Sequence, residues 1–590
     1  MTKKISRREL LKTSIAGFGA LSLPISLTAC GSDEDASDQA QAHPKVAFKH
    51  GVASGDPLQD RIILWTRLSP EDENLRYQVQ WEIAADQDFR QIINTGQVET
   101  SRSQDFTVKV DADRLSAGQT YFYRFKCASV YSSVGQTKTL ATQSKLVQFA
   151  VCSCSNYPAG YFHIYQEIAQ QDLDVVIHLG DYIYEYGMGG YATEQAAALG
   201  RSLAADNAEE IIKLEDYRKR YALYRTDADL QAAHQRHPFI VVWDDHELTN
   251  DTWEQGAENH DVSEGDFFAR KLAALQAYFE WMPIRPVSET DHLNIYRQFN
   301  FGDLVQLNML DTRILARNKQ LQYADYLTAT GLDANKFQTD LLNPTRTLLG
   351  HTQREWILKQ LSQSNAVWNV LGQQVLMSKM LIPAEILAVL GQITSGQATA
   401  DVLLQVRQML TELVGLKIRY LQNDPTLTKA ELARILTVVP YNLDAWDGYV
   451  VEREVIYTAC KQLNKKLIVL AGDTHNAWNS TLRDQAGSTV GVELATSSVS
   501  SPGMEKYLQI PLAQLQEFEM AFTTLIDELN YCNLNQRGYL SVAFTPDQVQ
   551  ANWIFIDSIQ NRSYQVDQSR AYQLQLDHEL NEIKPLKQTA

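Results

Sequence analysis

The chain has 590 residues, with 53 Lys and Arg against 71 Asp and Glu, a formal net charge of −18, and 44% hydrophobic residues. This composition is typical of a globular protein of about two to four domains. The acidic balance excludes broad attraction to nucleic acid or anionic lipid, because those partners require basic surfaces, so we expect no nucleic-acid-binding module. An anionic substrate would require a local positive centre such as a metal ion.

The first 29 residues have the features of an export signal. Arg7 and Arg8 lie in a basic segment, and residues 13–27 are mildly apolar and rich in Gly, Ala and Ser. This pattern resembles a twin-arginine export signal. It ends at Leu27-Thr28-Ala29-Cys30, which is similar to a bacterial lipobox, whose cysteine becomes lipidated. The alternative is an ordinary secretory signal with a chance cysteine.

Residues 30–44 form a polar segment after the signal. They contain no large apolar side chain and cannot bury enough surface to fold, so we expect a flexible tether after a lipid anchor on Cys30. The protein is then expected in the periplasm or cell envelope. Since the twin-arginine route carries folded proteins, it also hints at a cofactor that is loaded before export.

Residues 45–145 are expected to form an all-β domain. Segments at 62–66, 77–83, 106–110 and 121–125 alternate apolar and polar residues, as half-buried strands do. The segment 115–121 resembles the tyrosine corner of immunoglobulin-like and fibronectin-type sandwiches. We therefore predict an immunoglobulin/fibronectin-like β-sandwich that contributes binding or spacing.

Residues 146–590 change to an α/β pattern. Apolar runs separated by helical stretches predict buried strands in a layered catalytic domain, and they lie at 146–151, 175–179, 239–243, 305–310, 367–371 and 467–471. Leucines at helical spacing in about 382–440 and 504–532 predict inserted helices, which add core, cover the active face or mediate association. The polar tail is expected to be helical near 572–583.

Four of the predicted strands end in side chains that can bind metals. The carboxyl ends of strands carry the chemistry in layered α/β folds, and four such endings in one domain indicate a metal centre. The candidate residues that follow these strands are Cys152, Cys154, Asp181, Tyr184, Asp244, Asp245, His246, Asn250, Asp473 and His475.

Such a centre suits the hydrolysis of phosphate esters. Metal ions a few ångströms apart acidify water and neutralise charge on the phosphate, and a shared carboxylate such as Asp181 could bridge them. The thiolate of Cys154 and the phenolate of Tyr184 suit ferric iron better than magnesium. Oxygen ligands from Asp and Asn suit calcium or magnesium at the neighbouring position.

The motifs together resemble the alkaline phosphatase D (PhoD) family of calcineurin-like metallophosphoesterases. They span nearly the whole chain after the signal, at residues 52–57, 154–157, 180–186, 243–247, 310–313, 446–449, 472–475 and 536–539. The resemblance implies an α/β fold, namely a four-layer metallophosphoesterase-type β-sandwich flanked by helices. It also implies a site with Fe³⁺ and two Ca²⁺ ions.

The resemblance further implies roles for single residues. Cys154, Tyr184 and His475 would bind iron, and Asp181 would bridge iron and calcium. Calcium would be bound by Asp245, Asp473 and Asn250. His246 would lie beside the phosphate as a transition-state stabiliser or proton donor. Arg313, at a further strand end, would hold a substrate phosphate or pair with a structural carboxylate.

One alternative concerns the two neighbouring cysteines. Alternation along a strand would point Cys152 and Cys154 the same way, so residue chemistry by itself allows either as the ligand. The family spacing Cys-x-Asn-Tyr-x-x-Gly-Tyr selects Cys154. A disulfide between them is disfavoured, because residues two apart on a strand rarely meet disulfide geometry.

The predicted activity is metal-dependent hydrolysis of phosphate esters, with in-line attack by a metal-bound hydroxide or oxide. The substrate is a monoester, or a diester if the protein is a phosphodiesterase of the phospholipase D kind acting on phospholipid or teichoic acid. A different class remains open, a surface binding protein with a degenerate phosphoesterase fold. Intact ligands at all four strand ends disfavour that class.

Overall fold

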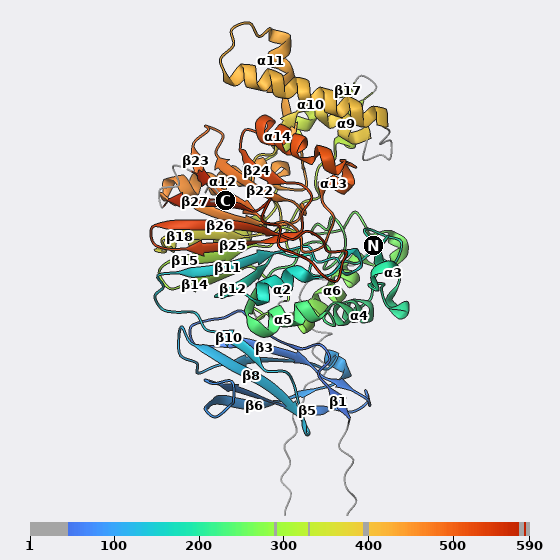
Figure 1. Ribbon diagram of the computed structural model, residues 1–590, viewed down its shortest axis with the longest axis vertical. Helices are drawn as coiled ribbons and strands as arrows, with labels where there is room; N and C mark the ends of the chain where they lie inside the picture. Colours follow the sequence, from blue (N-terminus) through green and yellow to red (C-terminus); the bar gives the residue numbers. More distant parts are fainter. Residues whose placement is uncertain (1–44, 288–291, 329–330, 393–399, 578–582, 586–590) are drawn as a thin grey trace, which may run out of the picture. The chain divides into compact units, whose positions relative to one another are not determined.

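Two large sheets dominate the computed structural model, which describes residues 45–287, 292–328, 331–392, 400–577 and 583–585 (Figure 1). The predicted export signal and tether lie outside these residues. The larger sheet has the strand order β28-β27-β26-β25-β11-β12-β13-β2-β3-β7 and the other β14-β15-β18-β21-β23-β22-β24. Within them, β11-β12-β13 and β15-β18-β21-β23 run parallel, as the near-continuous apolar runs indicate.

The strands of the larger sheet are β2 (Val52–Gly55), β3 (Ile62–Arg67), β7 (Thr107–Ala112), β11 (Val147–Cys152), β12 (Val175–His178), β13 (Pro238–Val241), β25 (Gly538–Phe544), β26 (Gln548–Phe555), β27 (Tyr572–Asp577) and β28 (Ile583–Pro585). Those of the second sheet are β14 (Arg297–Phe301), β15 (Val305–Met309), β18 (Trp368–Gly372), β21 (Leu467–Ala471), β22 (Ala477–Arg483), β23 (Thr489–Ala495) and β24 (Leu529–Asn533). Every apolar run predicted as a strand after residue 145 is confirmed.

The two sheets pack face to face. The rings of Phe149 in β11 and Phe301 in β14 lie 4.9 Å apart, and the Trp553 indole in β26 donates to the Ala495 carbonyl in β23 at 2.8 Å. Helices contribute to the cores on both outer faces. The result is the predicted four-layer arrangement, helix–sheet–sheet–helix.

One outer face belongs to the larger sheet and carries α2 (His163–Ala169), α4 (Leu214–Tyr224), α5 (Ala228–Arg236) and α6 (Phe267–Trp281). The other carries α8 (Gly350–Gln363), α9 (Ala384–Gln392), α10 (Ala400–Leu421), α11 (Lys429–Leu436), α12 (Val450–Gln462), α13 (Met504–Tyr507) and α14 (Leu515–Leu525). The short α3 (Ala196–Leu199) and α7 (Ala334–Leu341) lie in connections. Among the described helices, none is long and apolar enough to cross a bilayer.

The N-terminal strands form a β-sandwich with its own core. One sheet contains β5 (Tyr77–Ala84), β6 (Ile92–Thr100), β8 (Thr120–Cys127), β9 (Val130–Tyr131) and β10 (Gly135–Lys138). The tyrosine corner is present, since the Ser116 amide donates to Tyr121 Oη at 2.8 Å. The facing strands β2, β3 and β7 extend the larger sheet, because β2 pairs with β13. The larger sheet therefore continues across the expected boundary at residue 145.

The predicted helical insertion lies between two short paired strands. The strands β19 (Leu381–Pro383) and β20 (Val438–Pro440) pair, and α9, α10 and α11 lie between them in sequence. Two further strand pairs are β1 (Val46–Ala47) with β4 (Ser69–Pro70), and β16 (Leu327–Thr328) with β17 (Gly331–Leu332).

The prediction of a C-terminal helix near 572–583 is wrong where the structure describes that segment. Residues Tyr572–Asp577 form β27, which pairs with β26. Leu574 and Leu576 are fully buried, while the residues next to them are partly or fully exposed. This alternation of buried and exposed side chains is typical of a strand, and it decides the structure of the segment despite its polar composition.

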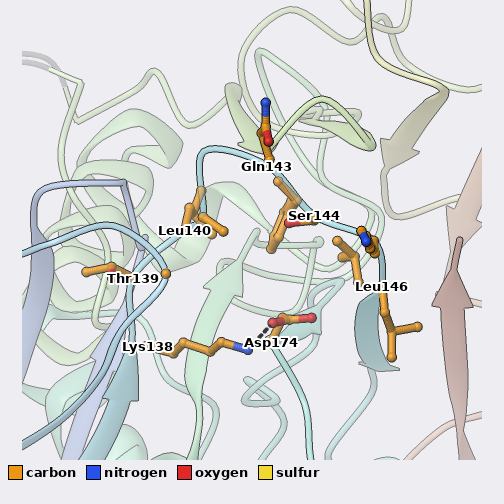
Figure 2. Close-up of a pocket in the computed structure, with 12 residues that line it drawn as sticks. Lys138, Thr139, Leu140, Gln143, Ser144, Leu146 and Asp174 are labelled. Carbon is orange, nitrogen blue, oxygen red and sulfur yellow. Dashed lines mark hydrogen bonds and ion pairs between the residues drawn. The ribbon is translucent and has the colours of Figure 1, made fainter. Parts of the chain in front are cut away.

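A pocket of about 250 Å³ marks the link between sandwich and catalytic layers (Figure 2). Residues of the 138–147 connection line it, and Lys138 forms an ion pair with Asp174 across it. Val147 and Asp174 lie at the amino ends of β11 and β12, whereas the predicted ligands follow the carboxyl ends. The pocket is thus at the opposite edge of the sheet from those ligands.

Candidate metal centre

The predicted ligands meet at the carboxyl edges of β11, β12, β13 and β21. Parallel strands bring these ends to one edge of each sheet, and the two facing sheets bring both edges together. Gly180 lies two residues after β12 with φ +106°, and a Cβ there would lie 2.4 Å from the Asp244 amide nitrogen. Only glycine lets these two loops approach so closely.

Four of the predicted ligands adopt left-handed backbone. The φ angles are +62° at Cys154, +56° at Asp181, +65° at Asp473 and +62° at His475. Non-glycine residues rarely adopt this conformation, which costs about 1–3 kcal/mol each and is concentrated at functional sites. The strands therefore end in strained turns that direct polar side chains into one space.

A first group contains Cys154, Asp181 and His475, each with a ligand atom within 4.8 Å of the others. Tyr184 joins it, because its hydroxyl donates to Asp181 Oδ2 at 2.9 Å and lies 3.1 Å from His475 Nε2. The Ser501 hydroxyl donates to Tyr184 Oη at 2.6 Å. Thiol, carboxylate, phenol and imidazole thus converge in one buried cluster.

The backbone orients His475 within this group. Its Nδ1 lies 2.8 Å from the Pro502 carbonyl oxygen, which can only accept a hydrogen bond. Nδ1 therefore carries the proton, and the lone pair of Nε2 faces Tyr184 and Asp181. Metal-binding histidines are commonly held in this way through their other ring nitrogen.

The donor set of the first group fits a metal ion. Burial, with Asp181 nearby, raises the pKa of the Cys154 thiol and of the Tyr184 phenol well above their ordinary values. A bound cation would favour loss of both protons. Asp181 Oδ1 is buried without a hydrogen-bond partner, so one ligand atom is available for such an ion.

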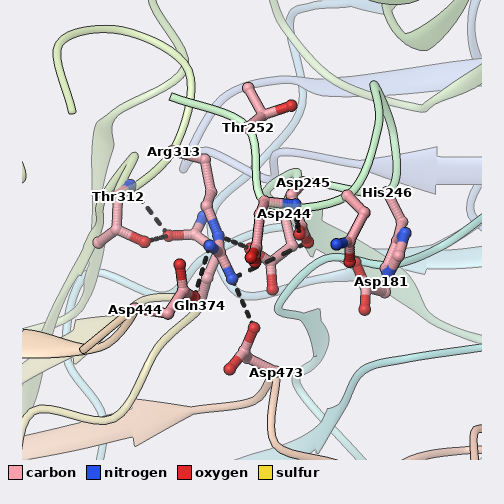
Figure 3. A network of polar contacts seen from close by, with 12 residues as sticks. Asp181, Asp244, Asp245, His246, Thr252, Thr312, Arg313, Gln374, Asp444 and Asp473 are labelled. Atoms are coloured by element: carbon pink, nitrogen blue, oxygen red, sulfur yellow. Dashed lines mark hydrogen bonds and ion pairs between the residues drawn. The ribbon is translucent and has the colours of Figure 1, made fainter. Parts of the chain in front are cut away.

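A second group contains Asp181, Asp245 and His246, and a third contains Asp244, Asp245 and Asp473. Asp181 belongs to the first and second groups, and Asp245 to the second and third. The three groups therefore share carboxylates and form one continuous cluster. Figure 3 shows the residues of the second and third groups.

Arg313 compensates the carboxylates of the third group (Figure 3). Its guanidinium donates to Asp244, to Asp473 at 2.5 Å and to Asp444 at 2.7 Å. Burial raises the pKa of Asp473 well above its usual range, although Arg313 opposes that shift. For Asp245, Arg313 and His246 outweigh burial and lower the pKa to about 2. The buried oxygen Asp244 Oδ2 has no hydrogen-bond partner, so this group also has capacity for a cation.

His246 is held by a buried carboxylate that the sequence reasoning did not single out. Its Nδ1 lies 2.7 Å from Glu185 Oε2, and Glu185 also accepts from the Asn250 amide and the Asn259 side chain. Burial lowers the pKa of His246, but Glu185, Asp181 and Asp245 outweigh it and raise the pKa well above its ordinary value. The imidazole is therefore favoured in its protonated form.

A second missed carboxylate, Glu247, ties two of the ligand loops together. It accepts backbone hydrogen bonds from Asp181 at 3.0 Å, Tyr182 at 2.5 Å and Asp244 at 2.8 Å. Both Glu185 and Glu247 lie inside the quoted motifs. Their positions were visible in the sequence, but their backbone and histidine partners were not.

The structure separates the two cysteines. Cys152 is the last residue of β11 and lies in the hydrophobic core, whereas Cys154 joins Asp181 and His475. The expected common direction of the two side chains is wrong, because the strand has ended and Cys154 has left-handed backbone. All five cysteines of the described residues are free.

Asn250, a predicted ligand, makes its hydrogen bonds outside the three ligand groups. Its side-chain amide donates to Glu258 at 3.1 Å, and its backbone amide supports Glu185. The calcium role of Asn250 stays a prediction.

Comparison with known proteins extends over nearly the whole chain. The family model "PhoD-like phosphatase" matches residues 149–553, and "PhoD-like phosphatase, N-terminal domain" matches residues 34–141. The chain is 34% identical over 556 residues to alkaline phosphatase D of Bacillus subtilis strain 168. The match covers 91% of this chain and 82% of that protein. It is also similar to the solved "Structure of PhoD", with 30% identity, a TM-score of 0.72 and 94% of each chain covered.

Proposed function

The chain belongs to the PhoD-like phosphatase family, and on that basis we propose that its strand-end cluster hydrolyses phosphate esters with ferric iron and calcium. The family and its alkaline phosphatase relative support metal-dependent phosphoester hydrolysis. The observation that carries the choice of site is Asp181, whose carboxylate belongs to two neighbouring groups of metal-type ligands.

Ligand chemistry supports the choice of metals. Thiolate, phenolate and imidazole donors suit ferric iron, so Cys154, Tyr184 and His475 would hold it together with Asp181, which the neighbouring group shares. Calcium prefers carboxylate and amide oxygens. For calcium we retain the predicted residues Asp181, Asp245, Asp473 and Asn250.

When bound, the ions neutralise charge on the phosphate oxygens and lower the pKa of water for in-line attack on phosphorus. His246 donates a proton to the departing alcohol oxygen, because Glu185 orients its ring and favours its protonated form. Arg313 donates hydrogen bonds to three carboxylates, and these contacts support a role in orienting Asp473 and Asp244 instead of direct contact with the substrate.

The proposal also includes the location of the protein in the cell. The arginine pair and Cys30 support twin-arginine export and a lipid anchor in the cell envelope. Replacement of both Arg7 and Arg8 by Lys should leave the precursor inside the cell. Cys30→Ala should release active protein from the membrane fraction. Normal export of the double-lysine protein, or continued membrane attachment of the alanine variant, would contradict this part.

The central test combines elemental analysis with turnover of a chromogenic phosphate monoester and diester. We expect about one iron and about two calcium ions per chain and turnover that requires calcium. The ratio of the two rates ranks monoester against diester substrates. A metal-free protein that iron and calcium fail to activate would instead indicate a binding protein with a degenerate phosphoesterase fold.

A matched pair of variants locates the activity. Asp181 follows β12 and Asp174 precedes it. Asp181→Asn should reduce kcat about 1000-fold, the equivalent of about 4 kcal/mol, while Asp174→Asn should leave kcat nearly unchanged. Full activity in purified Asp181→Asn would exclude the proposed centre.

A further inference from the structure

Arg220, on α4, is a buried arginine just outside the ligand cluster. It is 1% exposed, and burial lowers the pKa of its guanidinium. A buried arginine is usually paired with a carboxylate, as Arg218 two residues earlier is with Glu280. The hydrogen-bond acceptors of Arg220 are instead four carbonyl oxygens and one side-chain amide oxygen.

These acceptors lie on two separate segments. Nη1 donates to the carbonyl oxygens of Tyr184 and, at 2.9 Å, Tyr186. Nε donates to Asn207 Oδ1 at 3.0 Å, and Nη2 donates to the carbonyl oxygens of Asn207 and Glu209, each at 3.2 Å. The guanidinium therefore joins the 184–186 segment to the 207–209 segment.

The 184–186 segment carries two groups of the site. Tyr184 directs its phenol at Asp181 and His475, and Glu185 holds the His246 ring. The two carbonyl groups that Arg220 holds flank Glu185 on either side in sequence. The Glu185 carbonyl itself accepts from the Ile211 amide at 3.0 Å, so the segment is fixed at three successive carbonyl groups.

We infer that Arg220 is a positioning residue, which sets the Tyr184 phenol and the Glu185–His246 pair by holding the backbone between them. Arginine is required because its planar fork has five donors in fixed directions, whereas the lysine ammonium has three donors on a flexible stem. This inference rests on the proposed function, because it assigns the positioned groups to metal binding and proton donation.

The test uses the mature, metal-loaded protein with Arg220→Lys, which keeps the charge and removes the fork. Loss of an interaction that orients a metal ligand typically costs 10–100-fold in activity or metal affinity. We therefore expect kcat to fall about 10–100-fold with KM nearly unchanged. The iron retained after dialysis against a weak chelator should fall with it.

Arg218→Lys is the matched control. It lies on the same helix and also loses a fork, but its partners are Glu280 and the Ser103 carbonyl oxygen. We expect its kcat and iron retention to stay near those of the parent protein. Equal losses in both variants would overturn the inference, since they would reflect general loosening of α4. Parent-like kcat and iron retention in Arg220→Lys would overturn it as well.

A milder variant covers the case in which Arg220→Lys does not fold. Asn207→Ala removes one acceptor and leaves both carbonyl contacts to the 184–186 segment. It should lower kcat and iron retention in the same direction by a smaller factor, and no change in either would contradict the inference. If the parent protein hydrolyses no phosphate ester, the proposed function fails, while iron retention in these variants still decides the role of Arg220.

Discussion

Single residues at the strand ends combine two unfavourable properties that only a site explains. Cys154, Asp181 and His475 have strained backbone, and their polar side chains are buried close to one another. Uncompensated burial of such groups destabilises a protein, and a bound cation removes much of that cost. Residue type could be predicted from the motifs, but the strain and the shared burial appear only in the folded chain.

The cysteine pair offers a test at this scale. Cys154→Ala removes a proposed iron ligand and should lower kcat about 1000-fold with loss of bound iron. Cys152→Ala removes a similar volume from the hydrophobic core beside it and should keep the iron and most of kcat. Comparing kcat and iron content in the two purified variants checks this. Iron loss in Cys152→Ala alone would reverse the assignment.

Elements of the helical insertion contribute to the core of the second helical layer. Leu413 on α10 is fully buried, whereas Leu404 on the same helix is 52% exposed. Leu413→Ala should reduce the free energy of unfolding by about 2–5 kcal/mol, and Leu404→Ala by much less. Urea unfolding of both variants measures this difference, and kcat of the folded proteins should be unchanged. A large effect on kcat with unchanged stability would favour a covering role for the insertion.

His163 joins helices α2 and α5 to the connection between β26 and β27. Its Nδ1 lies 3.3 Å from Asp229, its Nε2 lies 2.8 Å from the Asn561 carbonyl oxygen, and its ring stacks on Tyr564. Burial lowers the pKa of His163, but the hydrogen bonds to Asp229 and Asn561 outweigh it and raise the pKa above 6.5. The folded state therefore favours the protonated imidazole.

This raised pKa sets the sign of a pH effect. The stabilisation is fully present below the unfolded pKa of about 6.5 and is lost as the pH rises through the folded pKa. His163→Gln should therefore reduce stability by about 1 kcal/mol more near pH 5.5 than near pH 9. Thermal melts at both pH values measure the difference, with the exposed His351→Gln as control. An equal effect at both pH values would contradict the proposed pairing.

At the scale of the whole molecule, the cluster couples metal binding to stability. Its ligands come from four strand ends in two sheets, so an ion bound there would join both sheets. A ligand at 100 times its Kd stabilises the folded state by about 2.7 kcal/mol. Chelation should therefore lower the unfolding temperature of the parent protein by several degrees, and that of Asp181→Asn by less. If a chelator does not change the unfolding temperature of the parent protein, the protein does not contain such an ion.

The sequence by itself determined the layered α/β architecture, the strands β11, β12, β13, β15, β18 and β21, and the types of side chain at the ends of the ligand-bearing strands. Those features follow from local period and residue chemistry, which are properties of short segments. Only the tertiary structure placed Cys154 apart from Cys152, extended the larger sheet through β2, and joined Glu185 to His246, 61 positions along the chain. Such contacts depend on how distant segments pack, and no local pattern records which backbone or side-chain partner a buried polar group will meet.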